Sequence, residues 1–180
     1  MRFTATDIDG CWLLGPEPRS DERGAFTRAY CREELWAVGV DLPVAQANLA
    51  STHRAGTVRG LHYQLPPSAE IKLVRAVRGA LFDVVVDLRP RSGSFGRWTG
   101  AELTADNGLS MLVPEGCAHG YQTLVDGTEA FYLTSAPYDG PNERGLHHAD
   151  PAVGIRWPHD ITVVSDKDRG LPPLSAAVLP

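Results

Sequence analysis

The segment Ala80-Leu81-Phe82-Asp83-Val84-Val85-Val86-Asp87-Leu88 decides the fold class. Side chains of an extended strand point alternately to its two faces, so this segment predicts a strand with one wholly apolar face. On the other face two carboxylates, Asp83 and Asp87, alternate with apolar side chains. Inside the protein such carboxylates would need partners, whereas on an exposed face they would need none.

Short segments of the same kind lie on both sides of this strand. The chain contains 18 glycines and 14 prolines, which divide it into short runs. Short strands bounded by turn residues are typical of an all-β sandwich or barrel. We expect further strands at residues 72–77, 109–113, 120–125 and 129–134, with Asp126-Gly127 as a hairpin turn before the last of them.

Helical structure is expected only at residues 31–38, where two glutamates occupy the first turn and Gly39 follows the end. The tail at residues 171–180 is rich in Pro and Ala and is expected to be peripheral. There is no internal repeat and no low-complexity linker. A chain of 180 residues is therefore expected to form one domain, residues 1–180.

The composition excludes several classes of protein. With 43% hydrophobic and 22% charged residues, the chain is not of a disordered type. It has no run of about 18–20 apolar residues and no secretory signal at its start, so we expect a cytoplasmic protein without membrane contact. A net charge of −5 does not favour nucleic acid as a partner. Local arginines could still bind an anionic small ligand.

The three cysteines, Cys11, Cys31 and Cys117, form no CxxC pair. They indicate neither a disulfide framework nor a zinc knuckle. Cys117 lies two residues before His119, which allows a thiol nucleophile, but packing is the interpretation that we prefer.

The first candidate for chemistry is the segment Arg59-Gly60-Leu61-His62-Tyr63-Gln64. On an extended strand, Arg59 and His62 would point to opposite sides. A neutral imidazole can remove a proton beside a carbonyl while an ammonium stabilises the resulting enolate oxygen. His62 and Lys72, which opens the next strand, would suit that reaction in a shared cavity. An isolated histidine in a strand, however, is more often structural.

The second candidate is the segment Pro114-Glu115-Gly116-Cys117-Ala118-His119-Gly120. It resembles the second half-motif of the cupin barrels, where the histidine points into the barrel and often binds a metal. The first half-motif would supply H-x-H and then a glutamate, but the corresponding positions are His62-Tyr63-Gln64. A metal needs three or four converging ligands. The sequence therefore predicts a cupin-type barrel that uses no metal.

Two tyrosines and a charged run complete the candidates. Tyr132 or Tyr138 could serve as the acid partner of a histidine base, although each alone is more often a packing residue. The run 166–169 would usually be a solvated surface. If one of its carboxylates reached His62, it would fix the imidazole tautomer and raise its basicity.

Together these segments resemble the dTDP-4-dehydrorhamnose 3,5-epimerase family over nearly the whole chain. The resemblance implies a jelly-roll (cupin-like) β-barrel with a few short peripheral helices, usually a homodimer whose protomers exchange contacts near the sites. It also implies a dTDP-linked 4-keto-6-deoxyhexose as substrate and no cofactor, because the C4 ketone itself acidifies the protons at C3 and C5. The stretches that carry it are residues 21–24, 58–64, 72–89, 94–98, 113–123, 129–138, 154–158 and 165–168.

The same resemblance implies roles for individual residues. His62 would be the base, Tyr132 the acid on the opposite face of the sugar ring, Lys72 the group at the C4 oxygen, and Asp168 the residue that orients His62. The implied substrate-binding residues are Arg23, Gln46, Asn48, Arg59, Asp83, His119, Tyr138, Glu143 and Lys167.

Three positions depart from the family pattern. Arg28 replaces a common glutamate near the nucleotide, Leu133 replaces a lysine or other polar residue, and Glu70-Ile71 replaces Gln-Gly. These changes leave open the nucleotide preference and whether C3, C5 or both carbons are epimerised. A cupin that binds a sugar nucleotide without catalysis is an alternative, but it would need neither an acid nor a base. A metal-dependent cupin oxygenase is the remaining alternative.

Overall fold

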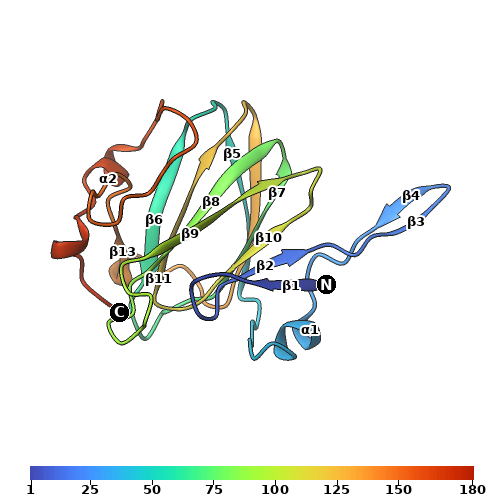
Figure 1. Cartoon of the computed structure of the whole chain (residues 1–180), viewed down its shortest axis with the longest axis horizontal. Helices are drawn as coiled ribbons and strands as arrows, with labels where there is room; N and C mark the ends of the chain where they lie inside the picture. Colours follow the sequence, from blue (N-terminus) through green and yellow to red (C-terminus); the bar gives the residue numbers. More distant parts are fainter.

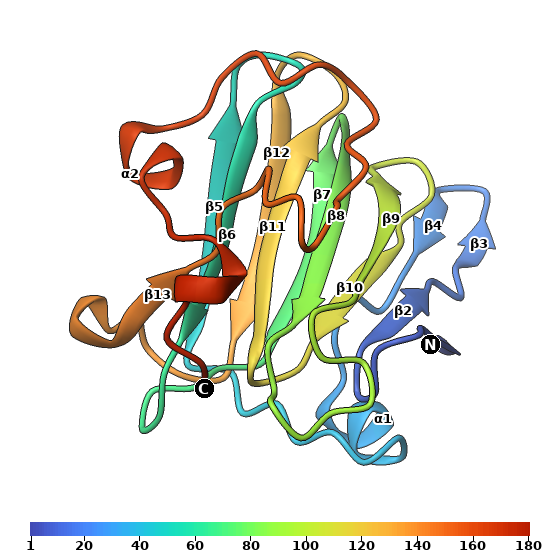
Figure 2. The ribbon, with the colours of Figure 1, turned by 60° about the vertical axis from the view of Figure 1, so that its left-hand side comes forward.

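Two antiparallel sheets make up most of the computed structural model, which describes all 180 residues (Figure 1). They face each other as a jelly-roll barrel (Figure 2), which confirms the expected all-β fold. The six-stranded sheet has the order β1 (Arg2–Ala5), β2 (Trp12–Gly15), β10 (Ser110–Val113), β7 (Lys72–Arg78), β12 (Thr128–Thr134) and β5 (Gln46–Thr52). The five-stranded sheet has the order β13 (Glu143–Gly145), β6 (Val58–Gln64), β11 (Cys117–Thr123), β8 (Ala80–Asp87) and β9 (Trp98–Thr104).

The strands expected from the sequence are all present, with small shifts at their ends. Residues 126–127 form the connection between β11 and β12, as the Asp-Gly pair predicts. The expected helix is α1 (Arg32–Trp36), which is shorter than predicted. It ends in a turn at Gly39, whose φ of 80° is a backbone conformation that glycine adopts readily.

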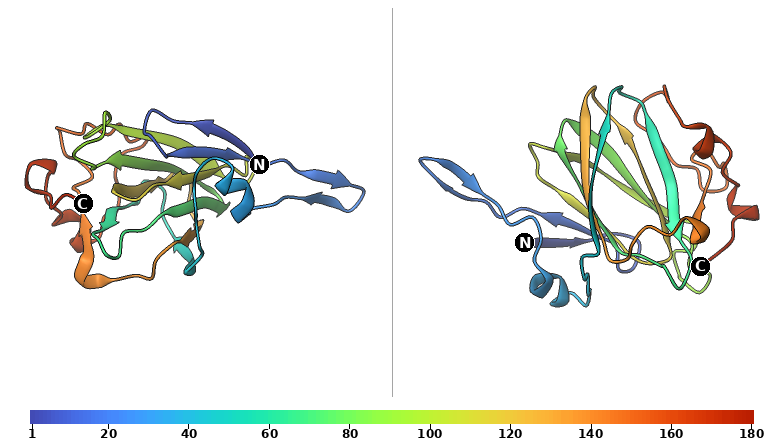
Figure 3. Two further views of the ribbon diagram at one scale, coloured as in Figure 1. Left: turned by 90° about the horizontal axis from the view of Figure 1, so that it is seen from below. Right: turned by 180° about the vertical axis from the view of Figure 1, so that it is seen from behind.

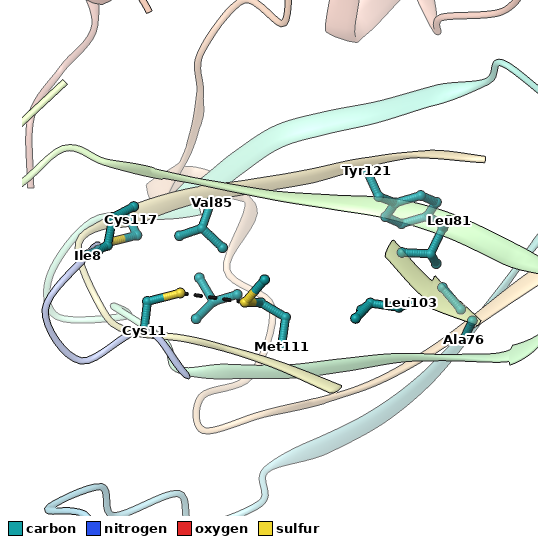
Figure 4. Packing of buried hydrophobic residues seen from close by; sticks show 11 residues of the cluster. Ile8, Cys11, Ala76, Leu81, Val85, Leu103, Met111, Cys117 and Tyr121 are labelled. Carbon is teal, nitrogen blue, oxygen red and sulfur yellow. Dashed lines mark hydrogen bonds between the residues drawn. The ribbon is translucent and has the colours of Figure 1, made fainter. Parts of the chain in front are cut away.

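The space between the sheets is filled by apolar side chains from both of them (Figure 4). From β8, Leu81 and Val85 point into this core, and Asp83 and Asp87 share their face. Both carboxylates are fully buried and both have partners, which answers the question that the strand pattern raised. The buried residues of this cluster are Ile8, Cys11, Ala76, Leu81, Val85, Leu103, Met111, Val113, Cys117, Tyr121 and Ala130.

The outer faces of both sheets are covered by other parts of the chain. On the five-stranded sheet, Val84 and Val86 pack with Leu146, Val153 and Leu174 from the C-terminal third. That third contains η1 (Gly140–Asn142), α2 (Asp166–Arg169) and η2 (Leu174–Ala176). On the six-stranded sheet, α1 and the segment after it cover Leu73, Leu112 and Leu133. No helix has the length and apolar character that crossing a membrane requires.

One element extends away from the barrel. The hairpin of β3 (Arg19–Asp21) and β4 (Gly24–Phe26) projects from the body of the molecule (Figure 3). All six of its strand residues are exposed, and Phe26 is 69% exposed. The hairpin therefore has no packing partner within its own chain.

Candidate active site

The alternation of strand β6 is interrupted at Gly60. His62 pairs with His119 and Arg59 pairs with Tyr121, so the two residues of β6 between these pairs lie opposite one residue of β11. Gly60 has a φ of 110°, and a Cβ atom there would lie 2.7 Å from the backbone oxygen of His119. The expectation that Arg59 and His62 face opposite sides is therefore wrong. Both side chains line one cavity.

His62 and Asp168 form the central contact of the site. The Nε2 atom of His62 lies 2.7 Å from Oδ1 of Asp168, and Oδ2 accepts a hydrogen bond from the backbone nitrogen of Gly60 at 3.0 Å. Asp168 belongs to the short helix α2, and the side chain of Ser165, which caps the N-terminus of that helix, accepts a hydrogen bond from the Asp168 nitrogen. Burial alone would raise the pKa of Asp168, but the contacts with His62 and Gly60 outweigh it and lower that pKa.

Two adjoining cavities meet at His62, Lys72 and Tyr132, which line both. The inner cavity has a volume of about 220 Å³ and continues to Arg59 and His119. The outer cavity has a volume of about 290 Å³. His62 comes from the five-stranded sheet, whereas Lys72 and Tyr132 come from the six-stranded sheet. The cavity is thus bounded by an imidazole on one wall and by a phenol and an ammonium on the other.

The wall that carries Lys72 and Tyr132 also holds the carboxylate of Glu70, which was not predicted as a site residue. Oε1 of Glu70 lies 3.0 Å from Nζ of Lys72, and the two side chains are only 9% and 14% exposed. The pKa of Tyr132 is raised, first by burial and then by the negative charge of Glu70. The sequence feature that could have indicated Glu70 is its spacing of two residues from Lys72, since residues two apart on an extended chain share a side.

Asp83 and His119 form a second buried pair. Nε2 of His119 lies 2.8 Å from Oδ1 of Asp83, which is fully buried beneath it. Only His119 lines the cavity, so Asp83 acts on the site through this histidine. Besides Glu70, six residues line the cavities without having been predicted as site residues: Ala50, Tyr63, Gln64, Gly120, Tyr121 and Thr134.

The outer end of the cavity is polar. Oε2 of Glu143 accepts hydrogen bonds from Lys167 at 2.6 Å and from the Tyr138 hydroxyl at 2.9 Å. Burial would raise the pKa of Glu143, but these bonds lower it, and the same carboxylate raises the pKa of Lys167. Gln46 accepts from the backbone nitrogen of Tyr138, and Asn48 lines the cavity beside it.

One predicted residue lies apart from the others. Arg23 is on the projecting hairpin, where it contacts Asp21 and is 85% exposed. It lines neither cavity that contains His62. Within one chain, the structure therefore brings together every predicted site residue except Arg23.

Two chemical alternatives can be examined from the side chains. No group of three or more His, Cys, Asp or Glu side chains is arranged to hold a metal ion. Cys117 is buried, and burial raises the pKa of its thiol to about 12. This environment does not favour the reactive thiolate, in agreement with the packing role.

Comparison with known proteins identifies the family. The family model described as dTDP-4-dehydrorhamnose 3,5-epimerase matches residues 5–176. The chain is 44% identical to dTDP-4-dehydrorhamnose 3,5-epimerase of Sinorhizobium fredii, over 97% of this chain and 90% of that protein. It is 39% identical to dTDP-4-dehydrorhamnose 3-epimerase of Streptomyces niveus, over 94% and 82%.

A solved structure agrees with these matches. The dTDP-4-dehydrorhamnose 3,5-epimerase of Bacillus anthracis, crystallised with TDP and pyrophosphate bound, superposes with a TM-score of 0.92 at 40% identity. The alignment covers 96% of this chain and 98% of that one. The chain therefore belongs to the dTDP-4-dehydrorhamnose 3,5-epimerase family.

Proposed function

We propose that the protein epimerises a dTDP-4-keto-6-deoxyhexose at C3, C5 or both, by proton transfer through an enolate. The observation that carries this proposal is the opposition of His62 and Tyr132 across shared cavities. Inversion of a carbon needs a base on one ring face and an acid on the other. The names of the relatives supply the substrate class, since they include a 3,5-epimerase and a 3-epimerase of dTDP-4-dehydrorhamnose.

The first half of the reaction is proton removal. His62 takes the proton from the carbon beside the C4 ketone, and the C–H electron pair forms the enolate double bond. Asp168 holds the imidazole by its Nε2 atom and stabilises the imidazolium that forms. The Lys72 ammonium stabilises the negative charge on the C4 oxygen.

The second half delivers a proton to the opposite face. The Tyr132 hydroxyl protonates the enolate carbon, the ketone is restored, and the configuration is inverted. Tyr132 is then a phenolate and His62 an imidazolium, so solvent must take one proton and supply another before the next turnover. Because solvent protons enter in every cycle, the reaction can be followed by isotope labelling.

The outer cavity would hold the nucleotide part of the substrate. Lys167, which bonds to Glu143 at the border of this cavity, and Arg59, which lines the adjoining inner cavity, are cations, and such groups bind phosphate oxygens. The same cavity is lined by Gln46, Asn48 and the ring of Tyr138. Glu143 accepts hydrogen bonds from both Tyr138 and Lys167. The related structure was crystallised with TDP bound, which supports a nucleotide as part of the ligand.

We further propose a homodimer in which Arg23 reaches the cavity of the partner subunit. The hairpin that carries Arg23 has no packing partner in its own chain, and Phe26 beside it is exposed. The edge strand β5, which supplies Gln46 and Asn48, also exposes the apolar side chain of Leu49 to 60%. A second copy that covers these side chains would bury apolar surface and bring an arginine toward the site.

Deuterium labelling tests the proposed function. The protein is incubated with dTDP-4-keto-6-deoxyglucose in deuterated water, and the ring carbons that gain deuterium are identified by NMR. Label at C3 and C5 would show the double epimerase, and label at one carbon the restricted form that the 3-epimerase relative represents. Bound substrate without label would instead indicate a sugar-nucleotide-binding protein and overturn the proposal.

A further inference from the structure

We propose that Glu70 is a positioning residue that holds the Lys72 ammonium in place and keeps Tyr132 in the protonated form that the reaction needs. The proposal rests on the function proposed above, because it concerns the acid and the enolate-stabilising cation of that reaction. Its evidence is separate, since it depends on the contacts of one carboxylate that the proposed proton transfers do not themselves use.

Glu70 lies inside the site. Its carboxylate lines the outer cavity with Lys72 and Tyr132, and its Oε1 atom contacts the Lys72 ammonium at 3.0 Å. With exposed fractions of only 9% and 14%, the pair is largely withdrawn from solvent. A charge in such a place acts more strongly on its neighbours than a surface charge does. A surface ion pair would not have this effect.

Glu70 is the negative group that acts on the phenol. Titratable groups approach Tyr132 from three directions: Glu70 and Lys72 from β7 and the segment before it, Arg59 and His62 from β6, and His119 and Tyr121 from β11. The group contributed by β5, Asn48, is neutral. Other carboxylates near the cavity have partners of their own: Asp83 with His119, Asp168 with His62, and Glu143 with Lys167.

The charges around the phenol act in opposite directions. After burial, Glu70 is the next largest cause of the raised pKa of Tyr132, and Arg59 opposes it. Without Glu70, the positive charge of Arg59 would act on the phenol without that compensation. The phenol would then lose its proton at lower pH.

A substrate-free measurement tests this inference directly. Tyrosine labelled with ¹³C at Cζ reports phenol ionisation, and Tyr132→Phe assigns the Tyr132 signal among the five tyrosines. In Glu70→Gln, the ionisation midpoint of Tyr132 should fall by roughly half a pH unit to one unit, as expected for loss of one nearby charge. An unchanged midpoint would overturn the proposal. Because no substrate is present, this result does not depend on the proposed activity.

The activity provides a second readout. The alkaline limb of kcat for epimerisation should move to lower pH in Glu70→Gln, so that kcat at pH values above the wild-type midpoint falls about threefold to tenfold while kcat near pH 7 changes less than twofold. The acidic limb should not move. Glu70→Asp, which restores the charge, should return the alkaline limb most of the way toward the wild-type position. A drop in kcat that is equal at every pH would show a merely structural role and contradict the inference.

A matched control separates the local effect from the change in net charge. Glu129 lies on β12, the same strand as Tyr132, and contacts Ser51 on the exposed side. Glu129→Gln removes the same charge from the chain but not from the cavity, so its pH profile should match wild type. If Glu129→Gln moved the alkaline limb as far as Glu70→Gln, the specific role of Glu70 would be refuted. If wild type itself showed no epimerisation, only the proposed function would fail.

Discussion

His62 Nε2 lies 2.7 Å from Asp168 Oδ1, and the second oxygen of that carboxylate binds the backbone nitrogen of Gly60. A single buried carboxylate, with a side chain 6% exposed, thus fixes both the imidazole and the bulge two residues before it. The lowered pKa of Asp168 keeps this group ionised at neutral pH. The orientation of the proposed base therefore depends on a residue 106 positions away in the chain.

Asp168→Asn should remove most of the activity without changing the shape of the site. The amide lacks the charge that holds the imidazole tautomer and stabilises the imidazolium, so deuterium wash-in should slow by roughly 10²- to 10⁴-fold. The control is Asp166→Asn, on the same helix but 95% exposed, which should exchange at the wild-type rate. Exchange in Asp168→Asn within twofold of wild type would show that Asp168 has no such role.

Gly60→Ala should disturb both stability and activity. The new Cβ would meet the His119 carbonyl at 2.7 Å, in a backbone conformation that alanine rarely adopts. We expect a loss of roughly 2–4 kcal/mol in the free energy of unfolding, measured by urea denaturation. Gly93→Ala has open space around its Cβ and should stay within about 0.5 kcal/mol of wild type. Equal stabilities of the two variants would be inconsistent with the proposed need for glycine at the bulge.

Asp87→Asn should reduce stability in a pH-dependent way. Burial would raise the pKa of Asp87, but hydrogen bonds from Arg89, Ser92 and Ser94 outweigh it and lower that pKa well below the usual range. Because the folded-state pKa lies below the unfolded one, the stabilisation is complete above the unfolded pKa of about 4 and is lost as pH falls below it.

Urea unfolding of Asp87→Asn and wild type at several pH values checks this prediction. The difference in unfolding free energy should be about 2–4 kcal/mol at pH 7 and should shrink toward about pH 3. Asp106→Asn, on an exposed turn, should differ little from wild type at any pH. A difference that grew as the pH fell would have the opposite sign to that expected from the lowered pKa.

Arg23→Ala should weaken the site of the partner subunit rather than its own. His62→Ala and Arg23→Ala proteins are each prepared as homodimers, then mixed and allowed to exchange subunits. A mixed dimer contains one site with both His62 and the partner's Arg23, so activity should rise well above that of either variant. If mixed dimers form and activity does not rise, Arg23 does not act across the interface.

The fold and the site differ in how far sequence could predict them. The period-two pattern of β8 identified a strand with two carboxylates on one face, because alternation is a local property. The partner of Asp83 could not be predicted in this way, since His119 is 36 positions away in the chain. Contacts of that range depend on which strands become neighbours in the barrel.

The two remaining differences have specific physical causes. Arg59 was assigned to the wrong side because a bulge at Gly60 shifts the register, and simple alternation contains no bulge. Glu70 was noticed only as a departure from the family pattern, although its spacing from Lys72 placed both on one side. Arg23 lies on a hairpin that extends beyond its own barrel, so a single chain cannot show what it contacts.

The central claim is that His62 removes the proton and Tyr132 delivers it to the opposite face. Exchange and inversion at the same carbon are measured together in deuterated water for wild type, His62→Ala and Tyr132→Phe. His62→Ala should show no deuterium at C3 or C5. Tyr132→Phe should still exchange, with the original configuration retained. Its inversion should be slower than that of wild type by at least roughly 10²-fold. Exchange that persisted in His62→Ala would contradict this assignment of the base.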